Sequence, residues 1–333
     1  MRASHTQVCD QVYGVVLGFA ADALWGDPRR CHPVAAFGRA ASAVERRMWR
    51  DHRGTGALYA ALCVGGAAAV GTGLAKGARR TGCSGVAVGV TGAAVWTVLG
   101  GTGLAREARA VGAALEAGDL EVARERLPGL CGRDPQTLDE RAVARAVVES
   151  VAENTSDAVV GALVWGAVAG VPGLLAFRAV NTLDAMVGHR SPRHQRFGWA
   201  SARLDDVAGW PGARLTSVLA TVAGPDPRGA VRAWRAGAHR HPSPNAGPVE
   251  ASFAGALGVR LGGTLSYGGR TEHRPELNGG EGREVGAGDI DRAVRLSRRV
   301  GLLALATTAL AGAAARAVSA RRALGRAREE GAR

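Results

Sequence analysis

Three carboxylates stand at four-residue intervals just before a long apolar run. Glu149, Glu153 and Asp157 lie in the segment "ESVAENTSD", and this spacing would place them along one face of a helix. Like charges at that spacing repel each other, and no Lys or Arg lies between them. Because several carboxylate oxygens suit Mg²⁺, the pattern predicts a magnesium site with Glu149, Glu153 and Asp157 as ligands. The alternative is a solvated helix end, capped by Asp157 or Ser156.

A second polar group follows the apolar run, in the segment "FRAVNTLDAMVGHR". It places Arg178, Asn181 and Asp184 at three-residue steps. Ionisable groups at the edge of a bilayer are costly and are usually functional or paired, so we expect Asp184 to act with Glu153 and Asp157 as a catalytic carboxylate. A guanidinium matches phosphate oxygens with its planar fork, so Arg178 is predicted to bind phosphate. Its alternative role is an anchor to anionic lipid.

Other candidates for binding substrate or phosphate lie in three further segments and on the helix that carries Glu153. Two prolines fix an extended loop in "GDPRRCHPVAAFGR". The Pro/Gly-rich loop "HPSPNAGPVE" could close over a substrate or form a rigid surface turn. The candidates from these segments, from "SARLDDVAGWPGAR" and from the Glu153 helix are Asp27, Arg29, His32, Asn154, Asp205, Asp206, His241, Asn245 and Glu250. With Arg178 and Asn181 they complete the predicted binding residues.

The composition favours a membrane protein and disfavours several other classes. The chain has 49 glycines in 333 residues and only 5% aromatic residues, and small residues let helices pack closely inside a bilayer. The net charge of +13 does not indicate nucleic acid, because basic and acidic residues are interspersed and no aromatic–basic stripe occurs. Lys76 is the only lysine, so no P-loop is present. The five cysteines form no CxxC pair, which disfavours a disulfide framework or a structural zinc site.

The hydropathy pattern predicts an all-α, polytopic integral membrane protein. Residues 57–75 and 84–105 are uncharged runs of about 20 residues, long enough to cross a bilayer as a helical hairpin. The other candidate membrane segments are 158–177, 207–223, which carries Arg214, and 300–315, which is short. Each could instead be a buried helix of a large soluble protein. We expect a single domain over residues 1–333, with soluble segments at 106–153 and 224–299 and a flexible loop at 268–288.

The segment from 158 to 177 creates a problem of topology. The arginine-rich stretch 29–53 argues that the hairpin 57–105 starts and ends at the cytoplasmic face. A full crossing by 158–177 would then carry "NTLD" to the opposite face. Pro172 and its flanking glycines favour a broken or re-entrant segment, which is tolerated at membrane depth when it is buried in protein.

Five segments, in order, resemble the characteristic blocks of the CobD/CbiB family of cobalamin biosynthesis. They are "GDPRRCHPVAAFGR", "ESVAENTSDAVVGALVW", "FRAVNTLDAMVGHR", "FGWASARLDDVAGWPGAR" and "HPSPNAGPVEASFAGALGVRLGG". The resemblance implies a multi-pass protein that joins aminopropanol or its phosphate to adenosylcobyric acid, as an adenosylcobinamide-phosphate synthase. The chain departs from the family pattern at Ala158, at Gly161 and Ala162, at His189 and at Gly209, but keeps every carboxylate of the main cluster.

This reaction is consistent with the candidate residues. Making an amide from an acid requires activation, usually by ATP, with Mg²⁺ and arginines to bind phosphoryl oxygens and a carboxylate to accept the proton of the amine. We therefore expect an acid–amine ligase in the cell membrane, with its active site facing the cytoplasm and with ATP as co-substrate. The corrinoid, the amine, the bilayer and other enzymes of the pathway are the expected partners. The alternatives are a membrane carrier for a small anion or metal and a non-catalytic scaffold.

Overall fold

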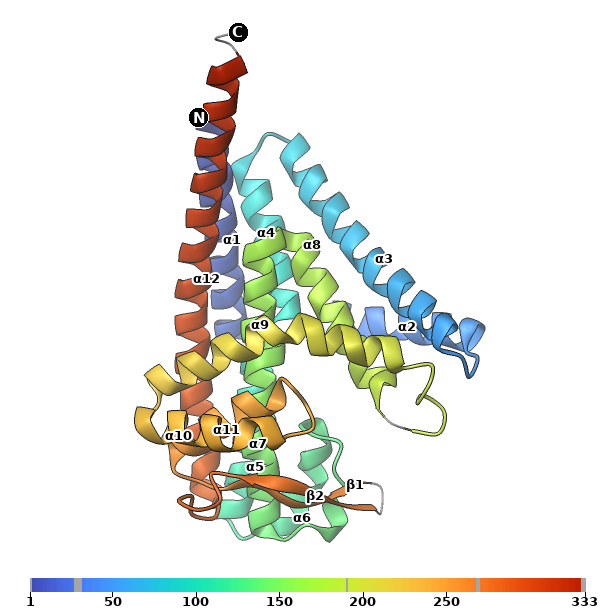
Figure 1. Cartoon of the computed structure of the whole chain (residues 1–333), viewed down its shortest axis with the longest axis vertical. Helices are drawn as coiled ribbons and strands as arrows, with labels where there is room; N and C mark the ends of the chain where they lie inside the picture. Colours follow the sequence, from blue (N-terminus) through green and yellow to red (C-terminus); the bar gives the residue numbers. More distant parts are fainter. Residues whose placement is uncertain (1, 27–31, 190, 268–269, 331–333) are drawn as a thin grey trace. The chain divides into compact units, whose positions relative to one another are not determined.

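The computed structural model describes residues 2–26, 32–189, 191–267 and 270–330, and it is helical almost throughout (Figure 1). The chain folds as two compact units, each assembled from segments that are distant in sequence. Unit 1 comprises residues 1–99, 162–205 and 305–333, and unit 2 comprises residues 100–161 and 206–304. The predicted all-α class is confirmed.

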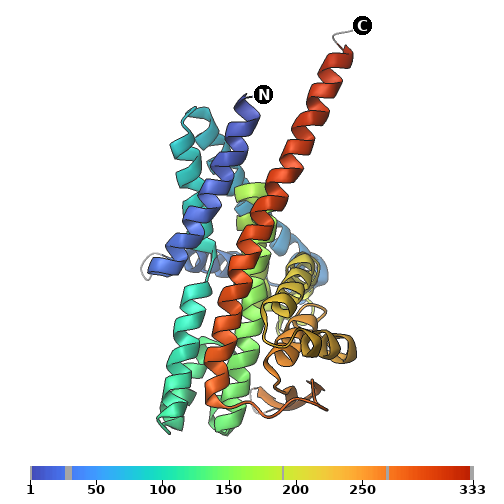
Figure 2. The ribbon, with the colours of Figure 1, turned by 90° about the vertical axis from the view of Figure 1, so that its left-hand side faces the viewer.

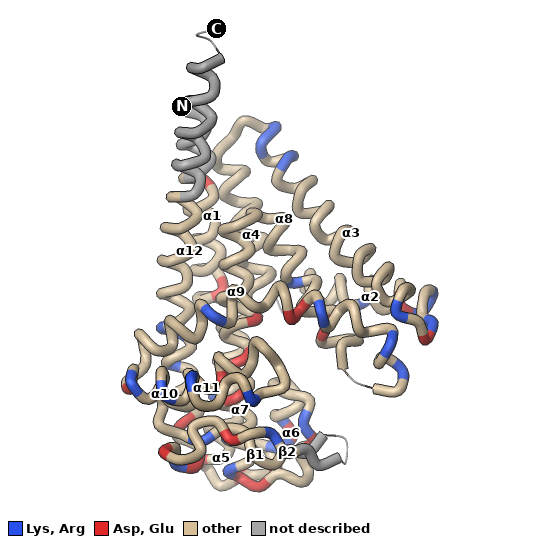
Figure 3. Tube along the Cα trace, in the orientation of Figure 1, with Lys and Arg blue, Asp and Glu red and all other residues tan. Residues whose placement is uncertain are grey.

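The described residues of unit 1 form helices joined by turns, without a strand. Its elements are α1 (Arg2–Trp25), α2 (Pro33–Met48), α3 (Arg53–Arg80), α4 (Ser84–Val98), most of α8 (Gly161–Leu183), a π-helical turn (Asp184–Gly188), the start of α9 (Trp199–Ala223) and the end of α12 (Ala287–Glu330). α3 and α4 form the predicted hairpin and contact each other. The central part of α3 carries no charge, and its basic residues lie at its ends (Figure 3).

Small residues allow α1 and α4 to pack side by side (Figures 1 and 2). A Cβ atom added to Gly14 would lie 2.5 Å from Cβ of Thr91, and one added to Gly18 would lie 2.5 Å from the carbonyl oxygen of Gly92. Any larger side chain at these positions would force the helices apart. The pair therefore shows the close packing that the high glycine content predicts for a membrane protein.

α8 is broken at Gly170, and the chain reverses direction there. Gly170 has φ +66° and ψ −149°, a backbone conformation that glycine adopts without steric cost. A Cβ atom at Gly173 would lie only 2.4 Å from the carbonyl oxygen of Trp165, although eight residues of continuous helix would separate such positions by about 12 Å. The predicted break in 158–177 is confirmed, two residues before Pro172.

Contacts within unit 1 hold the tip of this helical hairpin. The side-chain amide of Gln11 donates a 2.8 Å hydrogen bond to the carbonyl oxygen of Gly166. Gly71 lies against Pro172, since an added Cβ would be 2.7 Å from the proline Cα. The reversal is thus packed against α1 and α3, as non-helical backbone at membrane depth requires.

Three helical stretches of the described chain are long and apolar enough to cross a membrane. They are Arg53–Arg80, Ser84–Glu116 and Glu140–Gly188, and they contain the predicted segments 57–75, 84–105 and 158–177. The second stretch is interrupted, because α4 ends at Val98 and α5 begins at Gly101. The predicted segments 207–223 and 300–315 belong to helices that are not among these three.

Unit 2 combines α7 with further helices and one β-hairpin. Its elements are α5 (Gly101–Glu116), α6 (Leu120–Arg126), α7 (Glu140–Thr155), a π-helical turn (Ser156–Val160), most of α9, α10 (Pro227–Gly237), α11 (Ala246–Leu257), β1 (Leu261–Tyr267), β2 (Arg270–Leu277) and the start of α12. Short 3₁₀ turns lie at Leu127–Gly129, Pro135–Thr137 and Ala238–Arg240. The Asp139 side chain caps α7 by accepting a 2.8 Å hydrogen bond from the backbone N–H of Ala142, which explains where this helix begins.

The β-hairpin corrects one prediction. Residues 268–288 were expected to form a flexible loop, but 270–277 form β2, which pairs antiparallel with β1 and places Leu261 opposite Leu277. Gly262 and Gly263 both have positive φ at a register shift in β1. The strand depends on this cross-strand pairing, which the local sequence of β2 does not indicate.

Candidate functional site

A buried ion pair neutralises the first carboxylate of α7. The Glu149 side chain is only 4% exposed and accepts a hydrogen bond from the Arg133 guanidinium, which is also 4% exposed. The other carboxylate oxygen of Glu149 accepts a 2.7 Å hydrogen bond from the backbone N–H of Gly262 in β1. Both oxygens of Glu149 are therefore engaged by donors of the chain itself.

The second carboxylate of α7 pairs with an acid from α11. Glu250 is 2% exposed, and its carboxyl group is hydrogen-bonded to that of Glu153. Burial raises the pKa of Glu250 well above its ordinary value, and the negative charges of Glu153 and Glu149 raise it further. Two carboxylates in contact cannot both ionise cheaply. Burial therefore favours the protonated form of Glu250, beside the partly exposed Glu153.

His241 extends this buried cluster. Its Nδ1 accepts a 3.1 Å hydrogen bond from the backbone N–H of Ser243, and its Nε2 lies 3.6 Å from Oε1 of Glu250. Burial lowers the pKa of His241, and the positive charge of Arg274, whose guanidinium lies 3.5 Å from Nε2, lowers it further. Both effects favour the neutral form of the ring, whose Nε2 faces Glu250 and Arg274.

Asn245 ties the loop before α11 to the start of α9. Its side-chain amide donates a 3.0 Å hydrogen bond to the backbone carbonyl of Asp206. Gly209 lies against this amide, because an added Cβ would be 2.7 Å from Nδ2 of Asn245. A larger side chain at position 209 would therefore displace this amide. Asn154, by contrast, bonds within its own helix, to the carbonyl and the hydroxyl of Ser150.

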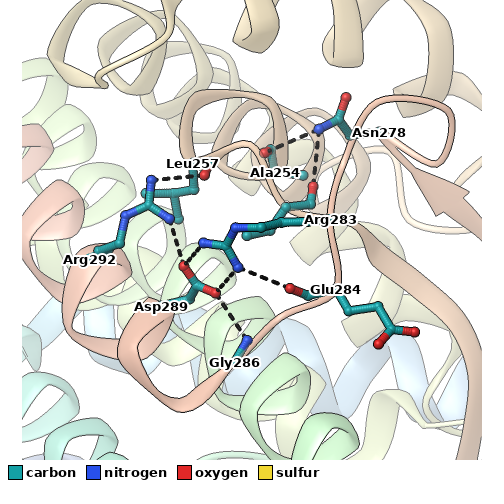
Figure 4. A network of polar contacts seen from close by, with 9 residues as sticks. Ala254, Leu257, Asn278, Arg283, Glu284, Gly286, Asp289 and Arg292 are labelled. Atoms are coloured by element: carbon teal, nitrogen blue, oxygen red, sulfur yellow. Dashed lines mark hydrogen bonds and ion pairs between the residues drawn. The ribbon is translucent and has the colours of Figure 1, made fainter.

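A polar network beside the β-hairpin fixes the segment that follows it. The buried carboxylate of Asp289 accepts hydrogen bonds from Arg283, from Arg292 and from the backbone N–H of Gly286 (Figure 4). Burial alone would raise the pKa of Asp289, but these donors outweigh it and lower the pKa below its ordinary value. The backbone of Arg283 is bonded in turn to that of Arg260, two residues before the Gly262 N–H that binds Glu149.

The remaining predicted residues lie elsewhere. Arg178, Asn181, Asp184 and Asp205 belong to unit 1, where the Arg178 guanidinium donates a 3.4 Å hydrogen bond to Asn181. His32 caps α2 by accepting a 3.2 Å hydrogen bond from the backbone N–H of Val34. Asp157 lies in the π-helical turn after α7. Asp27 and Arg29 are outside the described residues.

Arg133 and Arg274 were not predicted, although they are the cations of the cluster. Arg133 lies in the segment "CGRDPQT" and Arg274 in β2, and neither stands at a helical spacing from its partner. The stacked carboxylates of α7 need a positive charge beside them, and this need could have indicated an arginine. The sequence-based prediction instead expected Mg²⁺ to supply that charge. Within the described ranges, no three His, Cys, Asp or Glu side chains form a group that could hold a metal ion.

Comparisons with known proteins identify the family. Residues 15–297 match the family model described as CobD/Cbib protein. The chain is 53% identical over 291 residues to the cobalamin biosynthesis protein CobD of Mycobacterium tuberculosis (strain ATCC 25618 / H37Rv), covering 86% of this chain and 91% of the relative. It is 43% identical over 284 residues to the protein of the same name from Chromobacterium violaceum, covering 84% and 89%. No solved structure matches the chain. The extent of these matches, over the segments that carry the buried cluster, shows that the chain belongs to the CobD/CbiB protein family.

Proposed function

We propose that this protein acts in cobalamin biosynthesis as an acid–amine ligase that attaches aminopropanol or its phosphate to adenosylcobyric acid. Family membership and the names of the relatives support the pathway. Three helical stretches that are long and apolar enough to cross a membrane support a membrane enzyme. We further propose that it resides in the cell membrane, that its active site faces the cytoplasm, and that it uses ATP and Mg²⁺.

The observation that carries the proposal is the pairing of Glu153 with Glu250. The amine must lose a proton when its nitrogen attacks the activated acyl carbon. The bond from that carbon to its leaving oxygen breaks as the amide forms, and a carboxylate can accept the proton. Glu153 is partly exposed, whereas Glu250 behind it is buried, and burial favours the form of Glu250 that keeps its own proton. Glu153 is thus the member of the cluster that could receive a proton from a bound amine.

The donor set fits a magnesium ion that is held largely by substrate. Mg²⁺ is commonly bound by one or two carboxylates together with phosphate oxygens, so a group of three protein ligands is not required. Both oxygens of Glu149 are engaged by Arg133 and Gly262, and we therefore leave Glu149 out of the proposed ligands. Asp157, with Glu153 beside it, would hold the ion. Mg²⁺ would supply neutralisation of phosphoryl charge.

The other predicted residues are proposed as substrate contacts. The buried His241 and Asn245 hold the cluster together in unit 2. Asp184 is proposed as a further catalytic carboxylate. The residues proposed to bind substrate or phosphate are Asp27, Arg29, His32, Asn154, Arg178, Asn181, Asp205 and Asp206.

Product analysis tests the proposal. Purified full-length protein would be incubated with adenosylcobyric acid, MgATP, and either aminopropanol or aminopropanol phosphate, and the corrinoids would be analysed by mass spectrometry. We expect a product with the mass of one amine added and one water lost, formed only with ATP. Absence of this product with both amines, from protein that is folded and embedded in lipid, would reject the ligase assignment.

A further inference from the structure

The orientation of α9 in unit 2 is fixed by small residues on its inner face. A Cβ atom at Gly212 would lie 2.7 Å from the Cα of Gly161, so the two backbones are in direct contact. Ala213, Thr216 and Ala220 lie on this same face and are completely buried. Because a larger side chain would not fit there, the helix cannot turn another face inward.

The outer face of α9 is apolar and uncovered. Val207, Trp210, Val218 and Val222 are 73%, 52%, 47% and 67% exposed. They recur at steps of three, eight and four residues, which places them on one side of a helix. Arg214 completes this stripe, with its guanidinium 4.9 Å from the centre of the Trp210 ring.

α9 is not one of the three helical stretches suited to cross a membrane. Its part in unit 2 begins at Asp206 and carries Arg214 at mid-length. Four apolar side chains in a stripe along the helix axis form a surface that a partner lying parallel to that axis could cover.

α10 begins after a three-residue connection and presents a basic outer face. Its inner face is packed against α11, since a Cβ atom at Gly229 would lie 2.7 Å from the carbonyl oxygen of Gly255. Arg228, Arg232 and Arg235 recur at steps of four and three residues on the other side, and all are exposed. Arg232 pairs with Glu281.

We propose that the apolar stripe of α9 lies flat on an anionic lipid bilayer and that the basic row of α10 contacts the same bilayer. The valines and Trp210 would enter the boundary of the acyl chains, where a helix with one apolar face and basic residues beside it is stable. The arginines of α10 would lie against lipid phosphates, which attract basic residues near the surface. Charge complementarity selects this partner, because the apolar stripe is followed directly by three exposed arginines. The proposal does not depend on the reaction that the protein catalyses.

The depth of Trp210 tests the placement of α9. Full-length protein would be reconstituted in bilayers whose lipids carry bromine atoms either near the headgroup or near the end of the acyl chain. The difference in fluorescence between wild type and Trp210→Phe isolates the Trp210 signal, and bromine near the headgroup is expected to quench it more. Stronger quenching by the deep bromine would show that α9 crosses the membrane. No quenching by either lipid would show that α9 contacts water, a second copy or another protein. Both results would overturn the proposal.

The role of the arginines is tested with Val222→Trp, a reporter at the exposed end of α9. In mixed bilayers, brominated anionic lipid should quench it more than brominated neutral lipid at the same mole fraction. Arg228→Gln with Arg235→Gln should reduce this preference at least fivefold, since each arginine near an anionic surface contributes about that factor. The charge-matched control, Arg126→Gln with Arg141→Gln, should leave it unchanged. The proposal would be overturned if both double variants lost the preference for anionic lipid equally. It would also be overturned if Val222→Trp alone showed no such preference.

Discussion

Glu149 and Glu153 stand one helical turn apart, and the chain resolves their repulsion in two different ways. Glu149 forms a buried ion pair with Arg133, whose positive charge compensates its own. Glu153 lies beside the carboxyl group of Glu250, whose pKa is raised by burial. The first arrangement makes a fixed ion pair, and the second leaves a carboxylate that can still accept a proton. Structural and chemical roles are thus divided between neighbouring acids of one helix.

Removing Arg133 should destabilise the protein far more than removing a surface arginine. Arg133→Ala would leave Glu149 buried without its partner, which typically costs about 3–5 kcal/mol. Arg141 forms an ion pair with Glu284 in which the side chains are 72% and 50% exposed, so Arg141→Ala should cost about 1 kcal/mol or less. Denaturant unfolding followed by tryptophan fluorescence measures both. Similar losses in the two variants would contradict the role assigned to Arg133.

Asp157 should matter for catalysis and for magnesium. Asp157→Asn keeps the shape of the side chain but removes its charge, so the ligation rate should fall about a hundredfold or more, and residual activity should need more Mg²⁺. Asp139→Asn is the matched control, because asparagine also caps helices well and Asp139 lies at the other end of α7. If Asp157→Asn ligates at the wild-type rate with unchanged Mg²⁺ dependence, Asp157 does not hold the ion.

The acids of the site were predictable from the sequence, but their cations were not. Spacing along α7 and the Pro/Gly-rich loop indicated Glu153 and Glu250 as candidates. Their direct pairing could not be foreseen, because it joins side chains 97 positions apart in the sequence. Arg133 comes from a segment without periodicity, so no rule of spacing connects it with Glu149.

At the scale of elements, turns and glycines determine where the chain changes direction. Gly170 reverses α8, and the close contact of Gly173 with Trp165 makes this reversal a packed hairpin. The sequence indicated the break through Pro172 and its glycines. It did not indicate β2, because that strand exists through its pairing with β1. Local signals therefore predicted the helices and the break, whereas a non-local pairing was missed.

The Asp289 network should make stability depend on pH in the acid range. The folded state lowers the pKa of Asp289, so the stabilisation is complete above the unfolded value of about 3.9 and is lost as the pH falls through the folded value. Asp289→Asn should reduce stability by about 2 kcal/mol at neutral pH, the scale of a hydrogen bond to a charged group, and this deficit should shrink below about pH 4.

Melting temperature measured against pH checks this expectation. Asp291→Asn is the control on the same helix, because its side chain is 41% exposed and its surface ion pairs should contribute little. A deficit of Asp289→Asn that stays constant down to acid pH would show that the network does not depend on the charge of Asp289.

At the scale of the whole molecule, the protein is an all-α membrane protein, and its buried acid cluster lies within unit 2. Three apolar helical stretches provide the membrane character. The sequence predicted these stretches from their length and lack of charge. The division into two units was not predicted, because each unit combines segments from distant parts of the chain.

Membranes that contain the protein should retain it through an alkaline carbonate wash. Apolar stretches of this length are not displaced by high pH, whereas peripheral proteins in the same membranes are released and serve as the internal control. Immunoblotting of pellet and supernatant gives the result. Recovery of the protein in the supernatant, together with the peripheral proteins, would contradict the membrane assignment.

The ligation rate of Glu153→Gln tests whether Glu153 accepts the proton of the amine. Glutamine keeps the size of the side chain but cannot accept the proton of the amine, so kcat should fall by about a hundredfold or more, while the amount of protein in the membrane stays the same. Glu140→Gln, at the exposed start of the same helix, should ligate at the wild-type rate. If Glu153→Gln also ligates at that rate, the buried cluster of unit 2 does not contain the proton acceptor, and the account of the site is wrong.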